Sequence, residues 1–464
     1  MRRGPRSPES VSTGRSPRDV DPVRMAAFGI LMRLESRRGS IEGALRAAAS
    51  SFEDRDRRFL WTLVQETIRW KARLDALLAP LLHRPLAKLD PPVRVLLRMA
   101  ATQACLLDQI PAHAIVDEGV RLAAKMARPG AEKMVNAVSR RLIADGPVRW
   151  AHLAPGEDPA SWPVGTSHPS WLVARWRSRW GNADAFASLL WDNTRAPVWL
   201  RAAPGAPPPA GGQPGWVPGT YRMSEEYRPA EDPLFQEGAY TAQDPSEALV
   251  GLLPPAPSDA GAGADDGAED GADDGAPILD LCAAPGTKTT HLSSRFGARV
   301  VAMDRTRNRA QRLRETLART RLACPILIGD ASRPPLRPSS AAGVLLDAPC
   351  SALGVLRRRV DARWNVREED LRRLAKQQEG MLLAAANLVA PGGWLLYSVC
   401  STEPEETEQV RASFLGGSGL FEPLPFALDL PDEVRPSTGV LRIRPGQAEC
   451  DGVFACLFRK TGGR

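Results

Sequence analysis

Two cysteines stand where two apolar segments end, in the second half of the chain. The segment 343–349 (GVLLDAP) is followed by Cys350, and the segment 392–399 (GGWLLYSV) is followed by Cys400. Short apolar segments of this kind predict buried strands, and adjacent strands lie about 4.8 Å apart. Two thiols at neighbouring strand ends would line one pocket, where a thiolate acts as a nucleophile. A buried cysteine is more often inert packing, but the repetition at two strand ends beside Asp347 favours catalysis.

A second group of polar residues predicts a site for a nucleotide-like ligand. The segment 278–292 (ILDLCAAPGTKTTHL) follows a predicted strand and begins a predicted helix, yet it matches neither the dinucleotide fingerprint nor a Walker A loop. Asp304 and Asp330 end the next two apolar runs, where acidic side chains bond ribose hydroxyls or an adenine edge. Each aspartate alone is more often a helix cap or a turn residue. The three strand ends together favour adenosine with a short amino-acid tail.

The elements that must position these residues form an alternating pattern from 251 to the end of the chain. Alternating strands and helices predict an α/β domain with a mainly parallel sheet covered on both faces, with its ligands beyond the carboxyl ends of the strands. The predicted strands are 278–281, 299–304, 325–330, 343–349 and 392–400.

The first part of the chain has a different pattern. Residues 21–146 keep the 3.6-residue apolar period of helices and predict an all-α domain. Residues 147–250 mix Pro-rich loops with a segment in which Trp176 and Trp180 share a helix face, and we expect a linker and the beginning of the α/β region. Tryptophans at this spacing are more often core than a surface for stacking bases.

Composition and charge indicate the class of partner. The net charge is +7, and the segment 254–277 contributes seven acidic and no basic residues, so the remainder carries +14. This excess suits a polyanion such as RNA, and simple solubility explains it equally well. Residues 1–20 form a basic tail without the apolar core of a signal peptide. We expect disorder in 1–20 and in the acidic insertion 254–277.

Absent patterns narrow the prediction further. No apolar run reaches the ~18 residues of a membrane span, and seven cysteines are too sparse for a disulfide framework. Cysteine and histidine never fall at zinc-ligand spacing. We expect a cytoplasmic monomer with reduced thiols, no membrane contact and no metal.

Five motifs of the α/β part resemble those of one enzyme family. The family is that of the S-adenosylmethionine-dependent RNA cytosine-C5 methyltransferases, and together with the helical part the chain is similar to its RsmB (Sun/Fmu) branch, which modifies 16S rRNA. The motifs are DLCAAPGTKT (280–289), VVAMDRTRNR (300–309), GDASRPPL (329–336), LLDAPCSALGVLRRRVDARW (345–364) and LLYSVCSTEPEETEQV (395–410). The helical part resembles the NusB-type RNA-binding domain through RFLWTLVQETIRWKARLDALL (58–78) and PAHAIVDEGV (111–120).

The resemblance implies a Rossmann-like methyltransferase preceded by a NusB-like helical domain, with S-adenosylmethionine (SAM) as cofactor and 16S rRNA as partner. It assigns the nucleophile to Cys400, assistance in product release to Cys350, and a contact with the base or the cofactor to Asp347. Thr287 replaces the second glycine usual in the cofactor loop. The cofactor contacts that the resemblance implies are Cys282, Ala283, Ala284, Pro285, Gly286, Thr287, Lys288, Asp304, Arg309, Asp330 and Asp347.

The chemistry explains why two thiols are needed. Carbon 5 of cytosine attacks a methyl group only after a thiolate has added to carbon 6, and that bond must break again once the proton on carbon 5 has left. The base must be unpaired or flipped out of its helix, and we expect Arg357, Arg358 and Arg359 to be phosphate ligands or else solvated charges.

Three alternatives stay open. DNA cytosine methyltransferases attack from a Pro-Cys site, an arrangement that matches Cys350 instead of Cys400. The chain is alternatively an RNA-binding assembly factor without catalysis. A third possibility keeps the chemistry and changes the substrate to tRNA.

Overall fold

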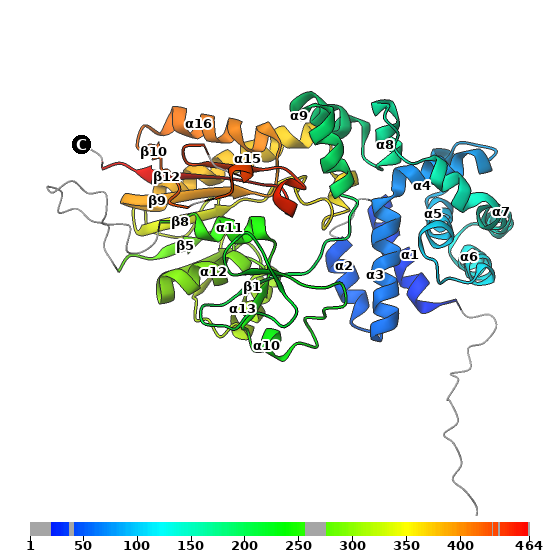
Figure 1. Cartoon of the computed structure of the whole chain (residues 1–464), viewed down its shortest axis with the longest axis horizontal. Coiled ribbons are helices and arrows are strands. Elements are labelled where there is room, and N and C mark those ends of the chain that lie inside the picture. Colours follow the sequence, from blue (N-terminus) through cyan, green and yellow to red (C-terminus); the bar gives the residue numbers. More distant parts are fainter. Residues whose placement is uncertain (1–19, 37–40, 256–274, 429, 435–436, 463–464) are drawn as a thin grey trace, which may run out of the picture. The chain divides into compact units, whose positions relative to one another are not determined.

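The computed structural model describes residues 20–36, 41–255, 275–428, 430–434 and 437–462 (Figure 1). The predicted basic tail 1–20, apart from its last residue, lies outside the described residues, as does most of the acidic insertion 254–277. The chain divides between Val173 and Ala174 into two compact units. None of the helices in these ranges combines the length and apolar character that a membrane crossing needs.

The first unit is helical, as predicted. Its core is made of leucines, valines and alanines that recur on one side of each helix, such as Leu60, Leu63 and Val64. Local signals start the helices: the Asp21 carboxylate accepts from the backbone N–H groups of Val23 and Arg24 at the first of them. The α-helices are α1 (Pro22–Glu35), α2 (Ile41–Ala49), α3 (Asp54–Arg69), α4 (Lys71–Leu78), α5 (Pro91–Leu106), α6 (Ala112–Met126), α7 (Ala131–His152) and α8 (Trp162–Gly165).

This unit continues beyond residue 146, where the sequence suggested a boundary. Helix α7 runs through Pro147 to His152, and the Arg73 guanidinium donates to the carbonyl of Trp150 at 2.5 Å. The same guanidinium lies 4.1 Å from the ring of Trp150. These contacts hold the end of α7 against α4, so the compact helical unit extends past residue 146.

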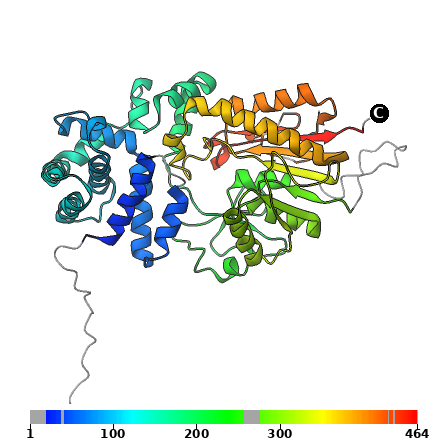
Figure 2. The ribbon, with the colours of Figure 1, turned by 180° about the vertical axis from the view of Figure 1, so that it is seen from behind.

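A twisted sheet forms the centre of the second unit (Figure 2). Within the described residues its order is β10-β12-β9-β8-β5-β6-β7, and β11 pairs with β12. The pairs among β5 to β9 are parallel and those of β12 are antiparallel, so the predicted mainly parallel sheet is confirmed. The strands are β5 (Ile278–Asp280), β6 (Val300–Asp304), β7 (Ile326–Ile328), β8 (Ala341–Asp347), β9 (Val389–Val399), β10 (Phe421–Pro423), β11 (Val440–Ile443) and β12 (Val453–Lys460).

Helices cover both faces of this sheet (Figures 1 and 2). On one face, Met381 and Phe414 of α15 (Glu368–Leu388) and α16 (Glu408–Ser418) pack with the sheet residue Tyr397. On the other face, Leu249 of α11 (Pro245–Leu252) and Leu292 of α12 (Thr287–Phe296) pack against the sheet. Helix α13 (Arg307–Arg319) follows β6 on the same side as α12. This is the doubly covered α/β architecture that the alternating pattern predicts.

The region expected to be largely linker contains a second, smaller sheet. Its order is β2-β3-β1-β4, from Gln213–Pro214, Thr220–Arg222, Trp199–Ala202 and Tyr240–Ala242. These strands are too short to leave a periodic signal in the sequence. In α9 (Ser170–Trp191), interrupted at Gly181, Trp176 is fully buried and its ring centre lies 4.9 Å from that of Trp180. The structural interpretation is confirmed for Trp176, whereas Trp180 is half-buried. The remaining short helix of the region is α10 (Pro233–Gln236), and α14 (Ala362–Asn365) follows β8.

Candidate active site

The two thiols of the strand-end motifs lie together. Strands β8 and β9 are parallel neighbours with Asp347 opposite Ser398, and each continues into a loop that carries one cysteine. The Sγ atoms of Cys350 and Cys400 are 3.3 Å apart, within hydrogen-bond distance for sulfur. The pair is therefore one chemical unit and not two separate buried cysteines.

The two thiols are not equivalent. The hydrogen bond to the Cys400 sulfur raises the pKa of Cys350 well above its usual range, and burial raises it further. Cys350 therefore holds its proton firmly, and either sulfur can be the donor in the hydrogen bond between them.

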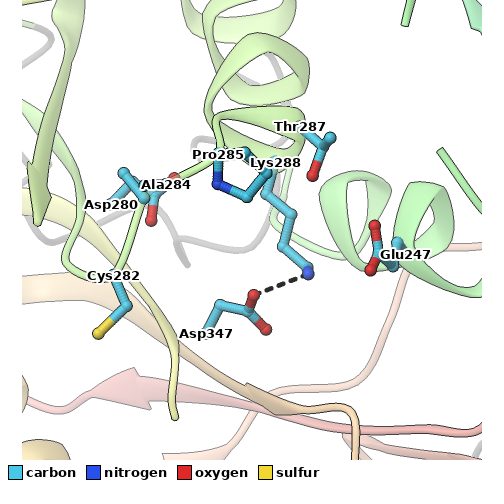
Figure 3. A pocket seen from close by; sticks show the side chains of 9 residues that line it. Glu247, Asp280, Cys282, Ala284, Pro285, Thr287, Lys288 and Asp347 are labelled. Carbon is cyan, nitrogen blue, oxygen red and sulfur yellow. Dashed lines mark hydrogen bonds and ion pairs between the residues drawn. The ribbon is translucent and has the colours of Figure 1, made fainter. Parts of the chain in front are cut away.

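A pocket lies at the carboxyl end of β5 and includes Asp347, the last residue of β8 (Figure 3). It is a hollow of about 410 Å³ that includes open solvent. The sequence predicted most of its lining and missed two acidic residues. The lining residues are Glu247, Asp280, Cys282, Ala283, Ala284, Pro285, Thr287, Lys288 and Asp347.

Lys288 is the basic group of the pocket lining. Its Nζ donates to Asp347 Oδ2 at 2.8 Å, the dashed contact of Figure 3. Burial alone would lower the pKa of the ammonium, but the negative charges of Asp347 and Glu247 outweigh burial, so the pKa is raised. A negative charge on the Cys400 sulfur acts in the same direction. Lys288 is therefore a fixed cation of the pocket, held by the carboxylates around it.

The carboxyl groups give the pocket an excess of negative charge. Burial raises the pKa of Asp280 to about 7 and also raises the pKa of Glu247. Asp280 Oδ2 accepts from the Thr289 hydroxyl at 2.7 Å, whereas its buried Oδ1 has no hydrogen-bond partner in the structure. An acceptor left without a partner inside a pocket indicates a ligand that donates there.

SAM fits the charges and hydrogen-bond acceptors of this pocket. Its methionine tail carries an ammonium, which suits Asp280 and Glu247, and a carboxylate, which suits the amino end of α12. Its sulfonium adds a second positive charge that the acidic lining accommodates. No triphosphate is expected in such a site, because the acidic side chains outnumber the single lysine of the lining.

Asp304 and Arg309 hold the turn 282–288 in place. Asp304 accepts from the Ala284 N–H at 3.0 Å and from Arg309 Nε at 2.7 Å, and Arg309 also donates to the Ala284 carbonyl at 2.9 Å. Gly286 has a φ of +109°, and a Cβ there would lie 2.8 Å from Leu313. The turn therefore requires glycine at this position, whereas Thr287 is accommodated as the first residue of α12.

Asp330 is separated from the pocket lining. It follows the end of β7 by two residues and accepts from the backbone N–H and the hydroxyl of Ser332. These hydrogen bonds lower the pKa of Asp330. Its contact with a cofactor stays a prediction.

The expectation that Arg357 binds phosphate is wrong. Its guanidinium is buried, with Nη2 3.0 Å from Asp244 and Nε 2.5 Å from Asp451. Arg358 pairs with the same two aspartates, which are distant in sequence and gave no local signal. The two arginines anchor the loop after Cys350 to the start of α11 and to the segment before β12. Arg359 is more exposed, and its role stays a prediction.

Glu247 and Asp280 are the pocket residues that sequence reasoning missed. Asp280 was a detectable signal, because it is a charged residue ending an otherwise apolar strand. Glu247 gave none, since α11 reaches the pocket only through tertiary packing. In the parts of the chain described by the structure, His, Cys, Asp and Glu side chains do not gather in threes as metal ligands.

Comparison with known proteins gives matches over both parts of the chain. Residues 271–459 match the model of the family "16S rRNA methyltransferase RsmB/F", and residues 21–144 match the NusB family. Ribosomal RNA small subunit methyltransferase B of Sodalis glossinidius is 31% identical, over 95% of this chain and 98% of that protein. The corresponding protein of Pseudomonas putida is 32% identical, over 84% of this chain and 88% of its own length.

Solved structures share the fold. The crystal structure of PH0851 superposes with a TM-score of 0.75 at 23% identity, over 95% of this chain and 99% of its own. NSun6 from Pyrococcus horikoshii, solved with SFG, superposes with a TM-score of 0.50 at 18% identity, over 64% of this chain and 99% of its own.

The fold, the pocket and these relatives define a SAM-dependent methyltransferase that acts on ribosomal RNA. Its helical part is a NusB-like RNA-binding domain. The chain belongs to the RsmB/F family of 16S rRNA methyltransferases.

Proposed function

We propose that this enzyme methylates carbon 5 of a cytosine in 16S rRNA through a covalent bond between Cys400 and carbon 6 of the base. The observation that supports this proposal is the 3.3 Å contact between the sulfurs of Cys350 and Cys400 beside the pocket. Methylation of a ring nitrogen or of a ribose hydroxyl needs no thiol, whereas carbon 5 needs one.

The turn 282–288 and the residues around it hold the cofactor in this proposal. When bound, SAM supplies a methyl group on a positively charged sulfur. Asp280 and Glu247 accept from its ammonium, and the first turn of α12 faces its carboxylate. Asp304 and Arg309 keep the turn in shape through Ala284, and we retain Asp330 for the adenine side. The lining residues Cys282 to Lys288 contribute mainly backbone and shape.

The two cysteines have successive roles. The Cys400 thiolate adds to carbon 6 of the cytosine, which makes carbon 5 nucleophilic enough to take the methyl group. The proton on carbon 5 then leaves to water, the bond between carbon 6 and sulfur breaks, and its electron pair returns to Cys400. The Cys350 thiol assists release because its hydrogen bond stabilises the departing thiolate.

Asp347 and Lys288 complete the site. Asp347 lies three residues before Cys350 and its carboxylate is held by Lys288. We propose that it accepts from the amino edge of the cytosine, so that the base is oriented with carbon 6 toward Cys400. The positive charge of Lys288 stabilises the attacking thiolate.

The substrate base must leave its stack, at a cost of roughly a few kcal/mol. We propose that the helical domain 21–146 contributes phosphate contacts that offset this cost, and that the regions 147–250 and 251–464 carry the catalytic half. The enzyme acts in the cytoplasm as a monomer in this proposal.

The test uses unmodified 16S rRNA and SAM with a tritiated methyl group. We expect Cys400→Ala to transfer no methyl group and Cys350→Ala to accumulate a covalent protein-RNA adduct that survives denaturing electrophoresis. Cys324→Ala is the matched control and keeps the wild-type rate, because Cys324 precedes β7, at the end of that strand opposite to the pocket, and its thiol donates to the backbone carbonyl of Val300.

Other outcomes would overturn the proposal. An active Cys400→Ala enzyme would refute the covalent role of Cys400, and an adduct in Cys400→Ala instead would exchange the two roles. Bisulfite sequencing of RNA from a deletion strain locates the missing mark, and a mark lost from tRNA instead of 16S rRNA would refute the substrate.

A further inference from the structure

A buried carboxylate connects the two cysteine loops. Glu406 is completely buried, and its Oε1 accepts from the backbone N–H of Ser351 at 2.9 Å. Its Oε2 accepts from the hydroxyls of Ser351 and Ser401, each at 2.5 Å. Ser351 follows Cys350 and Ser401 follows Cys400, so one side chain binds the residue after each thiol.

Two further groups fix the position of Glu406. Gln378 of α15 donates from Nε2 to Glu406 Oε1 and to the carbonyl of Pro349, each at 3.0 Å. The Tyr397 hydroxyl lies 3.0 Å from Gln378 Oε1 and 2.6 Å from the Glu406 carbonyl. Residues on both sides of Cys350 are therefore tied to one network with α15 and β9.

Burying the Glu406 carboxylate costs free energy that an apolar side chain in the same position would not. A buried carboxylate loses hydration, and burial raises the pKa of Glu406 although four hydrogen bonds act in the opposite direction. An apolar side chain of similar volume would pack in this position without that cost. What only an acceptor provides is a fixed connection between donors on two separate loops.

We propose that Glu406 is the positioning residue that holds Cys350 and Cys400 at their reacting separation by binding Ser351 and Ser401. This inference rests on the proposed roles of the two cysteines. Glu406 does not line the pocket, so it acts through the loops and not on the base or the cofactor.

The first experiment measures the thiol geometry without RNA or SAM. Diamide oxidises two neighbouring thiols to a disulfide, and it takes up the two protons and two electrons that they lose. We expect the full-length Glu406→Gln enzyme to form the Cys350–Cys400 disulfide about fivefold more slowly than wild type, because looser loops reduce the effective concentration of one thiol at the other. Peptide mapping after alkylation identifies the bond. An unchanged rate would overturn the positioning role.

Glu403→Gln is the control variant. Glu403 is equally buried, lies three residues from Glu406, and accepts from Arg175 and from the Trp176 indole instead of the two serines. We expect this change to lower thermal stability and to leave the disulfide rate unchanged. If both variants slow the reaction equally, general loosening explains the effect and the proposal fails.

The second experiment is single-turnover methyl transfer with saturating RNA and SAM. We expect Glu406→Gln to slow transfer about tenfold to a hundredfold with little change in the affinity for either substrate, because a small displacement of reacting groups costs rate and not binding. A variant that slows disulfide formation but transfers methyl groups normally would show that the cysteine pair is not the reacting unit, and the proposed function would fail with it.

Discussion

Replacing Asp280 by asparagine should stabilise the α/β unit and weaken the binding of SAM. Burial raises the pKa of this carboxyl from 3.8 to about 7, so the folded protein binds the proton more tightly than the unfolded chain. The favourable contribution of Asp280 to the free energy of unfolding is therefore fully present below about pH 4. It is lost as the pH rises to about 7. Since one pKa unit corresponds to about 1.4 kcal/mol, the charged carboxylate costs on the order of 4 kcal/mol at pH 8.

The Asp280→Asn variant removes this cost and weakens one hydrogen bond, that of the Thr289 hydroxyl to Oδ2, worth about 1 kcal/mol. We expect a net gain of about 2–3 kcal/mol at pH 8 and almost none at pH 4. Scanning calorimetry of the full-length protein across this range measures it as a rise of several degrees in the transition of the α/β unit. Isothermal titration should give about tenfold weaker SAM binding, because the ammonium loses a charged acceptor.

Asp304→Asn is the matched control, since both aspartates are buried at the ends of neighbouring parallel strands. Asp304 accepts from the N–H groups of Ala284 and Arg305 and from Arg309, so its replacement should destabilise the unit by about 1–3 kcal/mol. The reasoning is refuted if Asp280→Asn is no more stable than wild type at pH 8, or if its stability keeps the same dependence on pH.

Two further predictions concern the ion pairs near the site. Lys288→Met should reduce methyl transfer about tenfold or more at neutral pH, because Asp347 loses the partner that orients it; a normal rate in the tritium assay would show that the lysine is dispensable. Arg357→Met should destabilise the α/β unit by about 3–5 kcal/mol, because Asp244 and Asp451 stay buried with only Arg358 to neutralise them. Thermal unfolding measures this loss, and a change below about 1 kcal/mol would mean that water reaches the aspartates.

Local patterns in the sequence were sufficient for the elements that carry the site. The apolar runs that end before Cys350 and Cys400 are the strands β8 and β9, and the turn at 282–288 lies between β5 and α12 as predicted. Strand and helix periods depend on neighbouring residues, so one sequence determines them. The same reasoning found the helical domain, whose NusB match covers residues 21–144, while the compact unit that contains it extends to Val173.

Only the tertiary structure decided which partner each charge has. Arg357 follows the Cys350 motif and was expected to bind phosphate or to be a solvated charge, yet it is buried against Asp244 and Asp451, far away in sequence. Glu247 reaches the pocket through the packing of α11, and Glu406 joins two loops that begin 50 residues apart. Such contacts depend on which elements pack together, and no local period encodes that information. The sequence therefore predicted the residue types of the candidate site, and the tertiary structure determined which contacts hold them in place.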